Sequence, residues 1–218
     1  MASLTVTIAT DANGWLLQYM PELVSELSAR GHTVGLVHDV GLIPASDVTF
    51  LLSLSQIVPA HVRARSRNNI VVHESALPSG KGWSPTTWQV LQGAHIIPVS
   101  LFEAVERVDS GPIYARGEFL VSDVDLIAEI RAKQAAETVR LCLEFVDSYP
   151  FVLENAVVQD RNGETFYARR TPADSRLDPD RSIADQFNLL RVCDPDAYPA
   201  FFEMKGHRFK LILERMEG

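Results

Sequence analysis

The sequence has few cysteines, and the two that it has stand far apart. Cys142 and Cys193 lie in apolar stretches with helical spacing, and neither belongs to a Cys-x-x-Cys motif or a Cys/His cluster. Both are therefore expected to be reduced residues of the core. The histidines also lack the spacing of a metal site, so no metal ion is predicted.

Long apolar runs are absent too. No stretch approaches the roughly 18 apolar residues that indicate a transmembrane helix. The start of the chain, Met-Ala-Ser-Leu-Thr-Val, lacks the basic segment and the apolar segment of a signal peptide. We therefore expect a cytoplasmic protein with no membrane partner.

Positive charge is scarce, because 20 Lys and Arg residues stand against 28 Asp and Glu residues and leave a formal net charge of −8. Binding to nucleic acid needs basic surface that neutralises phosphates, so this balance disfavours a nucleic-acid partner.

Glycine is sparse in the first turn, where Gly14 stands alone. Without a Gly-x-Gly-x-x-Gly motif, a dinucleotide on the first helix is not expected.

What the chain does contain is an alternation of apolar strands and amphipathic helices. Two later strands are expected to pair antiparallel through a tight turn. The whole pattern predicts an α/β fold, a Rossmann-like, doubly wound and mostly parallel sheet, in residues 1–150. The expected strands are 4–9, 33–37, 48–54, 69–73, 96–106 and 112–121. The expected helices are 15–30, a short basic helix ending near Arg67, 85–91 and 123–148. Ser122 is the expected N-cap of the last helix.

After Pro150 the character of the chain changes. A hairpin is predicted from 152–158 and 165–169, followed by a polar segment and a helix at 182–193. A second hairpin is predicted from 200–203 and 208–213, through Lys205 and Gly206. Residues 151–218 are therefore expected to form a small α+β extension packed on the larger body.

A histidine and an aspartate stand where two of these elements end. His73 closes an apolar strand and a Pro/Gly/Ser/Lys loop follows it, while Asp109 lies in a polar interruption between two later strands. Ligands of open α/β sheets bind outside the carboxyl ends of the strands, so this pair is the candidate active centre. The plainer alternatives are a hydrogen-bonded structural histidine and a turn-forming Asp-Ser-Gly.

The residues around this pair resemble a known family. The run His73-Glu-Ser-Ala-Leu-Pro78, with Gly80-Lys-Gly82 and Pro85, resembles the His-x-Ser-Leu-Leu-Pro motif and loop of the folate-dependent formyltransferases. Val108-Asp-Ser-Gly-Pro-Ile113 resembles that family's Asp-x-Gly-Pro-Ile loop, at matching spacing. Further stretches resemble its folate-lining segment and the tail of its sugar-specific branch; they are Ser55-Gln-Ile-Val-Pro59, Arg169-Arg-Thr-Pro-Ala-Asp-Ser175, Asn188-Leu-Leu-Arg191 and Tyr198-Pro-Ala-Phe201.

The resemblance implies a formyltransferase fold and transfer of a formyl group from N10-formyltetrahydrofolate to an amine. Within the family, tRNA-specific members carry an extra basic β-barrel, and the short acidic tail here does not resemble it. The tail and the Gly-Lys-Gly-Trp-Ser-Pro loop resemble the nucleotide-sugar branch found with pseudaminic-type sugars. The implied acceptor is a UDP- or dTDP-linked amino sugar, and the implied setting is polysaccharide biosynthesis.

Residue roles follow from the same resemblance. His73 is the expected general acid and base, because an imidazole titrates near neutrality, and Asp109 is expected to orient it or to relay its proton. The implied roles are assistance by Ser75, folate binding by Gln56, Ile57, Pro59 and Val108, and substrate binding by Lys81, Trp83, Arg169 and Arg170. The plainer alternatives are that Lys81 is a solvated loop residue, that Trp83 packs under the loop, and that only one of the two arginines faces the site.

The chain departs from the family at one position. The family's site reads Asn-x-His, with the asparagine amide directed at the oxyanion, whereas this chain has Val71 two residues before His73. Asn69 lies a further strand step back, about 7 Å away at ~3.3 Å per residue. A catalytically silent folate- or nucleotide-sugar-binding protein and a formyltransferase acting on another amine therefore stay open. A homodimer through exposed apolar surface of the tail is also left open.

Overall fold

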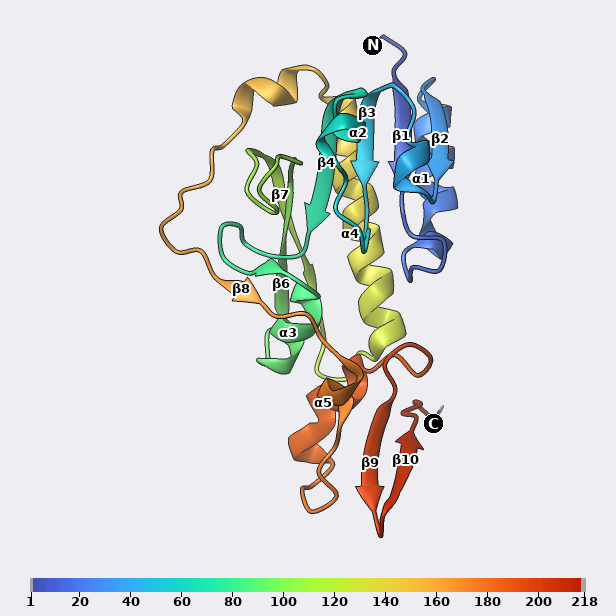
Figure 1. The fold of residues 1–218 in the computed structure, drawn as a ribbon, viewed down its shortest axis with the longest axis vertical. Helices are drawn as coiled ribbons and strands as arrows, with labels where there is room; N and C mark the ends of the chain where they lie inside the picture. Colours follow the sequence, from blue (N-terminus) through green and yellow to red (C-terminus); the bar gives the residue numbers. More distant parts are fainter. Residues whose placement is uncertain (1, 217–218) are drawn as a thin grey trace.

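A six-stranded sheet forms the centre of the computed structural model, which describes residues 2–216 (Figure 1). The strand order is β2-β1-β3-β4-β6-β7. The first four strands run parallel, and β6 runs antiparallel to both of its neighbours. The predicted doubly wound, mostly parallel sheet is therefore confirmed. The strands are β1 (Thr5–Ala9), β2 (Thr33–Val37), β3 (Ser46–Leu51), β4 (Ser66–His73), β6 (Ile96–Glu103) and β7 (Ile113–Leu120).

Both faces of the sheet are covered, and the pleat decides which side chain goes where. Even-numbered residues of the parallel strands, such as Ile8, Phe50 and Ile70, pack in the large core with α1 (Met20–Ala29) and α4 (Ile127–Asp147). Odd-numbered residues, such as Ala9 and Leu51, pack on the other side with the short α2 (Ala60–Arg63) and the 3-10 turn Val40–Leu42. The helix α3 (Pro85–Leu91) follows the loop after β4.

Two helix starts differ from the sequence pattern. The first helix is a 3-10 turn, Leu17–Tyr19, that passes into α1, and Pro21 lies in the first turn of α1, where its missing N–H costs nothing. The long helix begins at Ile127. Ser122 lies in the turn before it, where its hydroxyl donates to the Asp125 carboxylate at 2.7 Å. Ser122 is therefore not the N-cap of α4.

The predicted hairpin of 152–158 with 165–169 is wrong. Phe151–Asn155 is a 3-10 helix, Val157 bridges to Ile113 of β7, and β8 (Phe166–Tyr167) pairs parallel with β5 (Lys81–Gly82). Figure 1 shows this segment leaving the top of α4, passing outside β7 and returning as β8. An isolated two-stranded hairpin is marginal in water, whereas the body offers unpaired backbone at both places.

The rest of the extension follows the prediction more closely. The helix at 182–193 is shorter than expected, as 3-10 helix Ala184–Gln186 and α5 (Phe187–Val192), and Pro172–Ser175 forms another 3-10 helix. The last hairpin is confirmed as β9 (Ala200–Met204) and β10 (His207–Leu211), which turn at Lys205 and Gly206. Both cysteines are buried and free. Within residues 2–216, no helix is long and apolar enough to cross a membrane.

Candidate active site

A cavity of about 910 Å³ opens at the carboxyl ends of β1, β3 and β4. Its walls are the loops that follow these strands, one side of α4, and the segment from β8 into the extension. Its volume suits a small-molecule ligand, and its place is where open α/β sheets bind theirs. The cavity therefore contains the predicted active centre.

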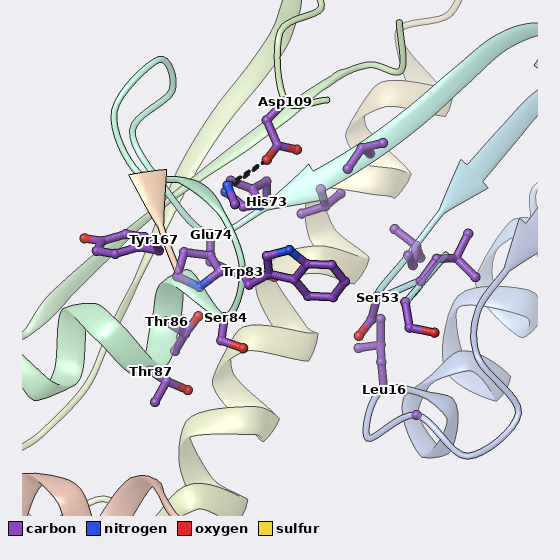
Figure 2. A pocket seen from close by; sticks show the side chains of 18 of the residues that line it. Leu16, Ser53, His73, Glu74, Trp83, Ser84, Thr86, Thr87, Asp109 and Tyr167 are labelled. Carbon is purple, nitrogen blue, oxygen red and sulfur yellow. Dashed lines mark hydrogen bonds and ion pairs between the residues drawn. The ribbon is translucent and has the colours of Figure 1, made fainter. Parts of the chain in front are cut away.

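His73 lies at the inner end of this cavity on the last position of β4 (Figure 2). Its side chain is buried, and its Nε2 lies 2.9 Å from the carbonyl oxygen of Gly80. A carbonyl can only accept, so Nε2 carries the hydrogen and donates it. In the neutral ring the lone pair then belongs to Nδ1, and this tautomer leaves the imidazole able to take up a proton.

Asp109 faces the histidine from the loop between β6 and β7. Its Oδ2 lies 4.0 Å from Nε2 of His73, an ion-pair distance, and accepts a hydrogen bond of 2.9 Å from the Gly82 N–H. The Asp109 backbone has φ 52°, a left-handed conformation that aspartate tolerates better than most residues. The loop thus holds a buried carboxyl group beside the imidazole.

The partners of both residues come from one short loop, which β8 holds in place. The Lys81 N–H donates to the Thr165 carbonyl at 2.9 Å and the Trp83 N–H to the Tyr167 carbonyl at 3.2 Å. Gly82 has φ +102°, and a Cβ there would lie 2.4 Å from the Tyr167 carbonyl oxygen. Only glycine fits this approach, so the β5–β8 pairing fixes the loop that contacts His73 and Asp109.

Lys81 does not lie where the resemblance implies. Its side chain is 1% exposed, and its ammonium donates to Glu164 at 2.9 Å and to the Ser110 hydroxyl at 2.8 Å. Arg107 completes the cluster with a 2.5 Å contact to the same carboxylate. Lys81 is absent from the cavity wall and ties the active-site loops together, so its expected contact with substrate is wrong.

Two more predicted site residues lie outside the cavity wall. Ser75 is fully enclosed, and its backbone N–H donates to the His73 carbonyl at 2.8 Å in the turn that ends β4. Pro59 precedes the first residue of α2. Both shape the backbone that leads to the site, and neither side chain is placed to touch a ligand in the cavity.

The predicted folate-binding residues Gln56, Ile57 and Val108 do line the cavity. Ile57 is 72% exposed and Val108 is 51% exposed, so both present apolar surface at the rim. Exposed apolar side chains at the mouth of a cavity favour a flat aromatic ligand. This surface fits the pterin and aryl parts of a folate.

Trp83 and both predicted arginines also line the cavity. The Arg169 guanidinium lies 4.5 Å from the centre of the Trp83 ring, a cation–π contact. Arg170 donates to the Asp174 carbonyl at 3.0 Å. On a strand, the alternation of side chains would turn only one of the two arginines into the cavity. It does not apply here, because β8 ends at Tyr167, before Arg169 and Arg170.

The sequence did not single out Glu74, which lines the cavity beside His73 (Figure 2). Strand alternation would turn the side chain after His73 away from the site. β4 ends at His73, however, and the tight turn at Ser75 brings Glu74 to the cavity wall. Burial raises the pKa of the Glu74 carboxyl, while a charge on His73 and a hydrogen bond from the Gln134 side chain lower it.

The far end of the cavity was also not predicted. Arg131 of α4 pairs with Asp194 at 2.7 Å and lies 5.7 Å from the centre of the Trp15 ring. Near Glu74 and Ser84 (Figure 2), Thr86 was not singled out either, and it has a buried hydroxyl with no hydrogen-bond partner among the described residues. These groups come from four separate segments, so no local motif could have brought them together. Within residues 2–216, no three His, Cys, Asp or Glu side chains are placed to hold a metal ion.

Comparison with known proteins agrees with this geometry. Residues 29–146 match the family described as formyl transferase. The methionyl-tRNA formyltransferase of Novosphingobium aromaticivorans is 32% identical over 177 residues, which cover 79% of this chain and 56% of that protein. The chain spans about half the length of the curated relatives that it matches.

Solved structures share the fold. A likely sugar N-formyltransferase of Mycobacterium tuberculosis superposes with a TM-score of 0.73 at 20% identity, over 99% of this chain and all of that one. HypX of Aquifex aeolicus, solved with tetrahydrofolic acid, gives 0.77 at 20% identity over 97% of this chain and 38% of that one. The family match covers more than half of the sequence and includes both His73 and Asp109. The chain therefore belongs to the formyl transferase family.

Proposed function

We propose that this protein transfers the formyl group of N10-formyltetrahydrofolate to the amino group of a nucleotide-linked amino sugar. The observation that carries the proposal is the buried His73–Asp109 pair at the inner end of a cavity of about 910 Å³. Membership in the formyl transferase family supports the reaction, and the solved sugar-specific and tetrahydrofolate-bound neighbours support the two substrates.

The reaction needs a proton to move from one nitrogen to another. A neutral amine attacks the formyl carbon, the carbonyl electrons move onto oxygen, and the amine must then lose a proton. The lone pair of His73 can accept it, and the imidazolium that results lies beside the Asp109 carboxylate. When the bond between the formyl carbon and N10 breaks, its electrons stay on N10, which receives that proton from the His73 imidazolium. The products are a formamide and tetrahydrofolate.

The cavity offers different surroundings for the two substrates. Ile57 and Val108 at the rim suit a folate ring, as described above. Arg169 and Arg170 suit the phosphates of a nucleotide, because guanidinium groups bind phosphate through paired hydrogen bonds. Trp83 adds an aromatic face that a base or a sugar can stack on. This arrangement supports a small anionic acceptor.

A tRNA acceptor is the competing assignment, since curated relatives include methionyl-tRNA formyltransferases. The net charge of −8 argues against it, because a tRNA-binding surface must neutralise many phosphates. A third assignment, a silent binding protein, rests on Val71, whose apolar side chain lines the cavity beside His73.

The test is incubation with N10-formyltetrahydrofolate and, separately, a panel of UDP- and dTDP-linked amino sugars and methionyl-tRNA. Tetrahydrofolate release and the mass of the formylated acceptor are read together. We expect both signals with an amino sugar, their loss in His73→Ala, and their retention in His207→Ala, a variant at an exposed histidine of β10. Formylation of methionyl-tRNA alone, or folate binding without any product, would contradict the proposal.

A further inference from the structure

Three residues of the cavity wall have a left-handed backbone although they are not glycine. Ser53 has φ 52°, Ser84 has φ 49° and Asp109 has φ 52°. Among the described residues, Lys205 in the β9–β10 turn is the one other case. This conformation is costly for a residue with a Cβ, and aspartate tolerates it better than serine does. Such strain gathers at ligand sites, so the two serines need an explanation.

Ser84 stands directly before Pro85 and α3, where a serine usually caps a helix. A capping serine has an extended backbone, and its hydroxyl accepts a hydrogen bond from the first turn. Here the backbone is left-handed, with ψ 47°, and the side chain makes no capping hydrogen bond. Ser84 is instead exposed on the cavity wall. Its hydroxyl is therefore available to a ligand.

The turn at Ser84 does not by itself require a serine. Before it, the Trp83 N–H donates to the Tyr167 carbonyl at 3.2 Å. After it, the Trp88 N–H donates to the Ser84 carbonyl at 3.2 Å, so the segment is fixed on both sides. A glycine would make the same left-handed turn without steric cost. The serine side chain therefore contributes something other than the turn.

Thr86, in the same wall, is a second hydroxyl without a partner. It is 7% exposed, and its hydroxyl makes no hydrogen bond to any described residue. Buried hydroxyls are nearly always hydrogen-bonded, because an unpaired one destabilises the fold. Thr86 also lines the cavity, and Figure 2 shows it beside Ser84 on the side that holds His73. The strain at Ser84 and the unpaired hydroxyl of Thr86 are independent observations that indicate a ligand at one wall.

Hydroxyl groups beside an aromatic ring suit a sugar. A hydroxyl both donates and accepts, so it pairs with the hydroxyls of a sugar ring. Trp83 adjoins Ser84, is 39% exposed, and has the Arg169 guanidinium 4.5 Å from its ring centre. The ring is thus held in place, with surface left for the C–H face of a sugar. Neither hydroxyl carries a charge, so the phosphates of a nucleotide belong with the arginines of the wall.

We propose that Ser84 and Thr86 form a subsite for the sugar ring of the acceptor, with their hydroxyls bonded to ring hydroxyls. A sugar held at this wall presents its amine at the end of the cavity that contains His73. Ser53 lies after β3, in the loop of the predicted folate residues, and has no part in this subsite. The subsite rests on the proposed function for its ligand, and binding measurements without turnover keep the two apart.

Calorimetric titrations of protein saturated with tetrahydrofolate test the subsite. The ligands are the UDP- and dTDP-linked amino sugars and, separately, UDP and dTDP. We expect Ser84→Ala and Thr86→Val each to weaken binding of the nucleotide sugar by about 3–10-fold, the effect of one neutral hydrogen bond. The affinities for the free nucleotide and for tetrahydrofolate should stay at their wild-type values. Ser25→Ala, at an exposed position of α1, is the control.

Three outcomes of these titrations would overturn the subsite. Wild-type affinity for the nucleotide sugar in either variant would remove that hydroxyl from the contact. Equal weakening of the free nucleotide and the nucleotide sugar would place the contact at the nucleotide. Weaker binding of tetrahydrofolate would place it at the folate.

Melting temperatures separate contact with a ligand from a role in the fold. Ser84→Gly relieves the left-handed backbone and Thr86→Val removes the unpaired hydroxyl, so each should raise the melting temperature of the ligand-free protein by about 2–4 °C. Lys205→Gly relieves similar strain, at φ 51°, and should raise it without any change in sugar binding. A lower melting temperature in Ser84→Gly or Thr86→Val would mean that the residue serves the fold, and would overturn the subsite.

Turnover decides the proposed function separately. A wild type that binds a nucleotide sugar without formylating it would end the proposed function, while the comparison of variants would still decide the subsite. A wild type that binds no nucleotide sugar of the panel would overturn both.

Discussion

At the scale of single residues, the site depends on one imidazole whose hydrogen position is fixed by its surroundings. The Gly80 carbonyl fixes the proton on Nε2 of His73, and Asp109 supplies a negative charge 4.0 Å away. These two contacts hold the ring in one tautomer beside a carboxylate.

Replacing Asp109 with asparagine tests this charge. The asparagine side chain would keep an oxygen for the Gly82 N–H but would lose the charge that stabilises the imidazolium. We expect Asp109→Asn to lower kcat by about 10²–10⁴, the range of general acid–base assistance, with little change in folate binding. Asp185→Asn, at an exposed position before α5, is the control. Wild-type turnover in Asp109→Asn would show that the carboxylate is not used.

Two glycines offer a matched test of the loop. Gly82 and Gly163 both have positive φ, +102° and +91°, so alanine brings a backbone cost of about 1–2 kcal/mol at either position. Only at Gly82 would the new Cβ meet the Tyr167 carbonyl oxygen, at 2.4 Å, whereas nothing lies within 4 Å at Gly163. We expect Gly82→Ala to lose both stability and activity, and Gly163→Ala to lose a little stability alone. Equal activities would contradict the loop's role.

At the scale of elements, the pairing of β5 with β8 joins the extension to the active-site loop. Lys81 of β5, Glu164 before β8 and Arg107 of the Asp109 loop form one ion cluster. A buried ammonium is costly to leave alone, so this cluster fixes three segments relative to each other. The extension therefore contributes to the geometry of His73 although it lies far from it in sequence.

The ion cluster gives a pH-dependent prediction. The hydrogen bond from Lys81 lowers the pKa of Glu164 below its ordinary value of 4.5. A carboxyl with a lowered pKa stabilises the fold above its ordinary pKa, and this stability is lost as the pH falls through the lowered value. We expect Lys81→Met to melt at a lower temperature than the wild type at neutral pH. The difference between the two melting temperatures should become smaller in acid. Lys210→Met, exposed on β10, is the control; a constant gap at all pH values would contradict the assignment.

The elements also show what a sequence can and cannot predict. The strands of the sheet and the last hairpin were predictable because apolar periodicity and turn residues are local properties. The partner of the strand predicted at 165–169 was not predictable, because β8 pairs with β5, which lies more than 80 residues earlier in the sequence. Lys81 was misassigned for the same reason, since Glu164 is distant in sequence. Glu74 was missed because strand alternation stops at His73, where the chain turns.

At the scale of the whole molecule, the extension is held to the body by a buried arginine. Arg191 of α5 is 2% exposed, and its guanidinium donates to the Ser122 carbonyl at 2.6 Å and to Asn188 at 2.9 Å. A small apolar cluster supports it from within the extension; its buried members are Leu177, Leu190, Cys193 and Ala200. The division of the chain near residue 150 stays a prediction.

Removing this arginine tests how the two parts depend on each other. Arg191→Leu removes the charged partner of the part-buried Ser122 carbonyl, and a hydrogen bond to a charged group contributes about 1.5–3 kcal/mol. We expect a lower melting temperature and faster proteolysis within 172–200. The exposed Arg161→Leu is the control. An unchanged protease pattern would mean that Arg191 does not hold the extension in place.

The proposed function requires His73 to move the proton in a formyl transfer. The most direct measurement is a single turnover with N10-formyltetrahydrofolate labelled with ¹³C at the formyl carbon, in the wild type and in His73→Ala. We predict that the label appears as a formamide on the nucleotide-linked amino sugar in the wild type and stays on the folate in His73→Ala. Label transfer at equal rates in the two proteins would contradict it.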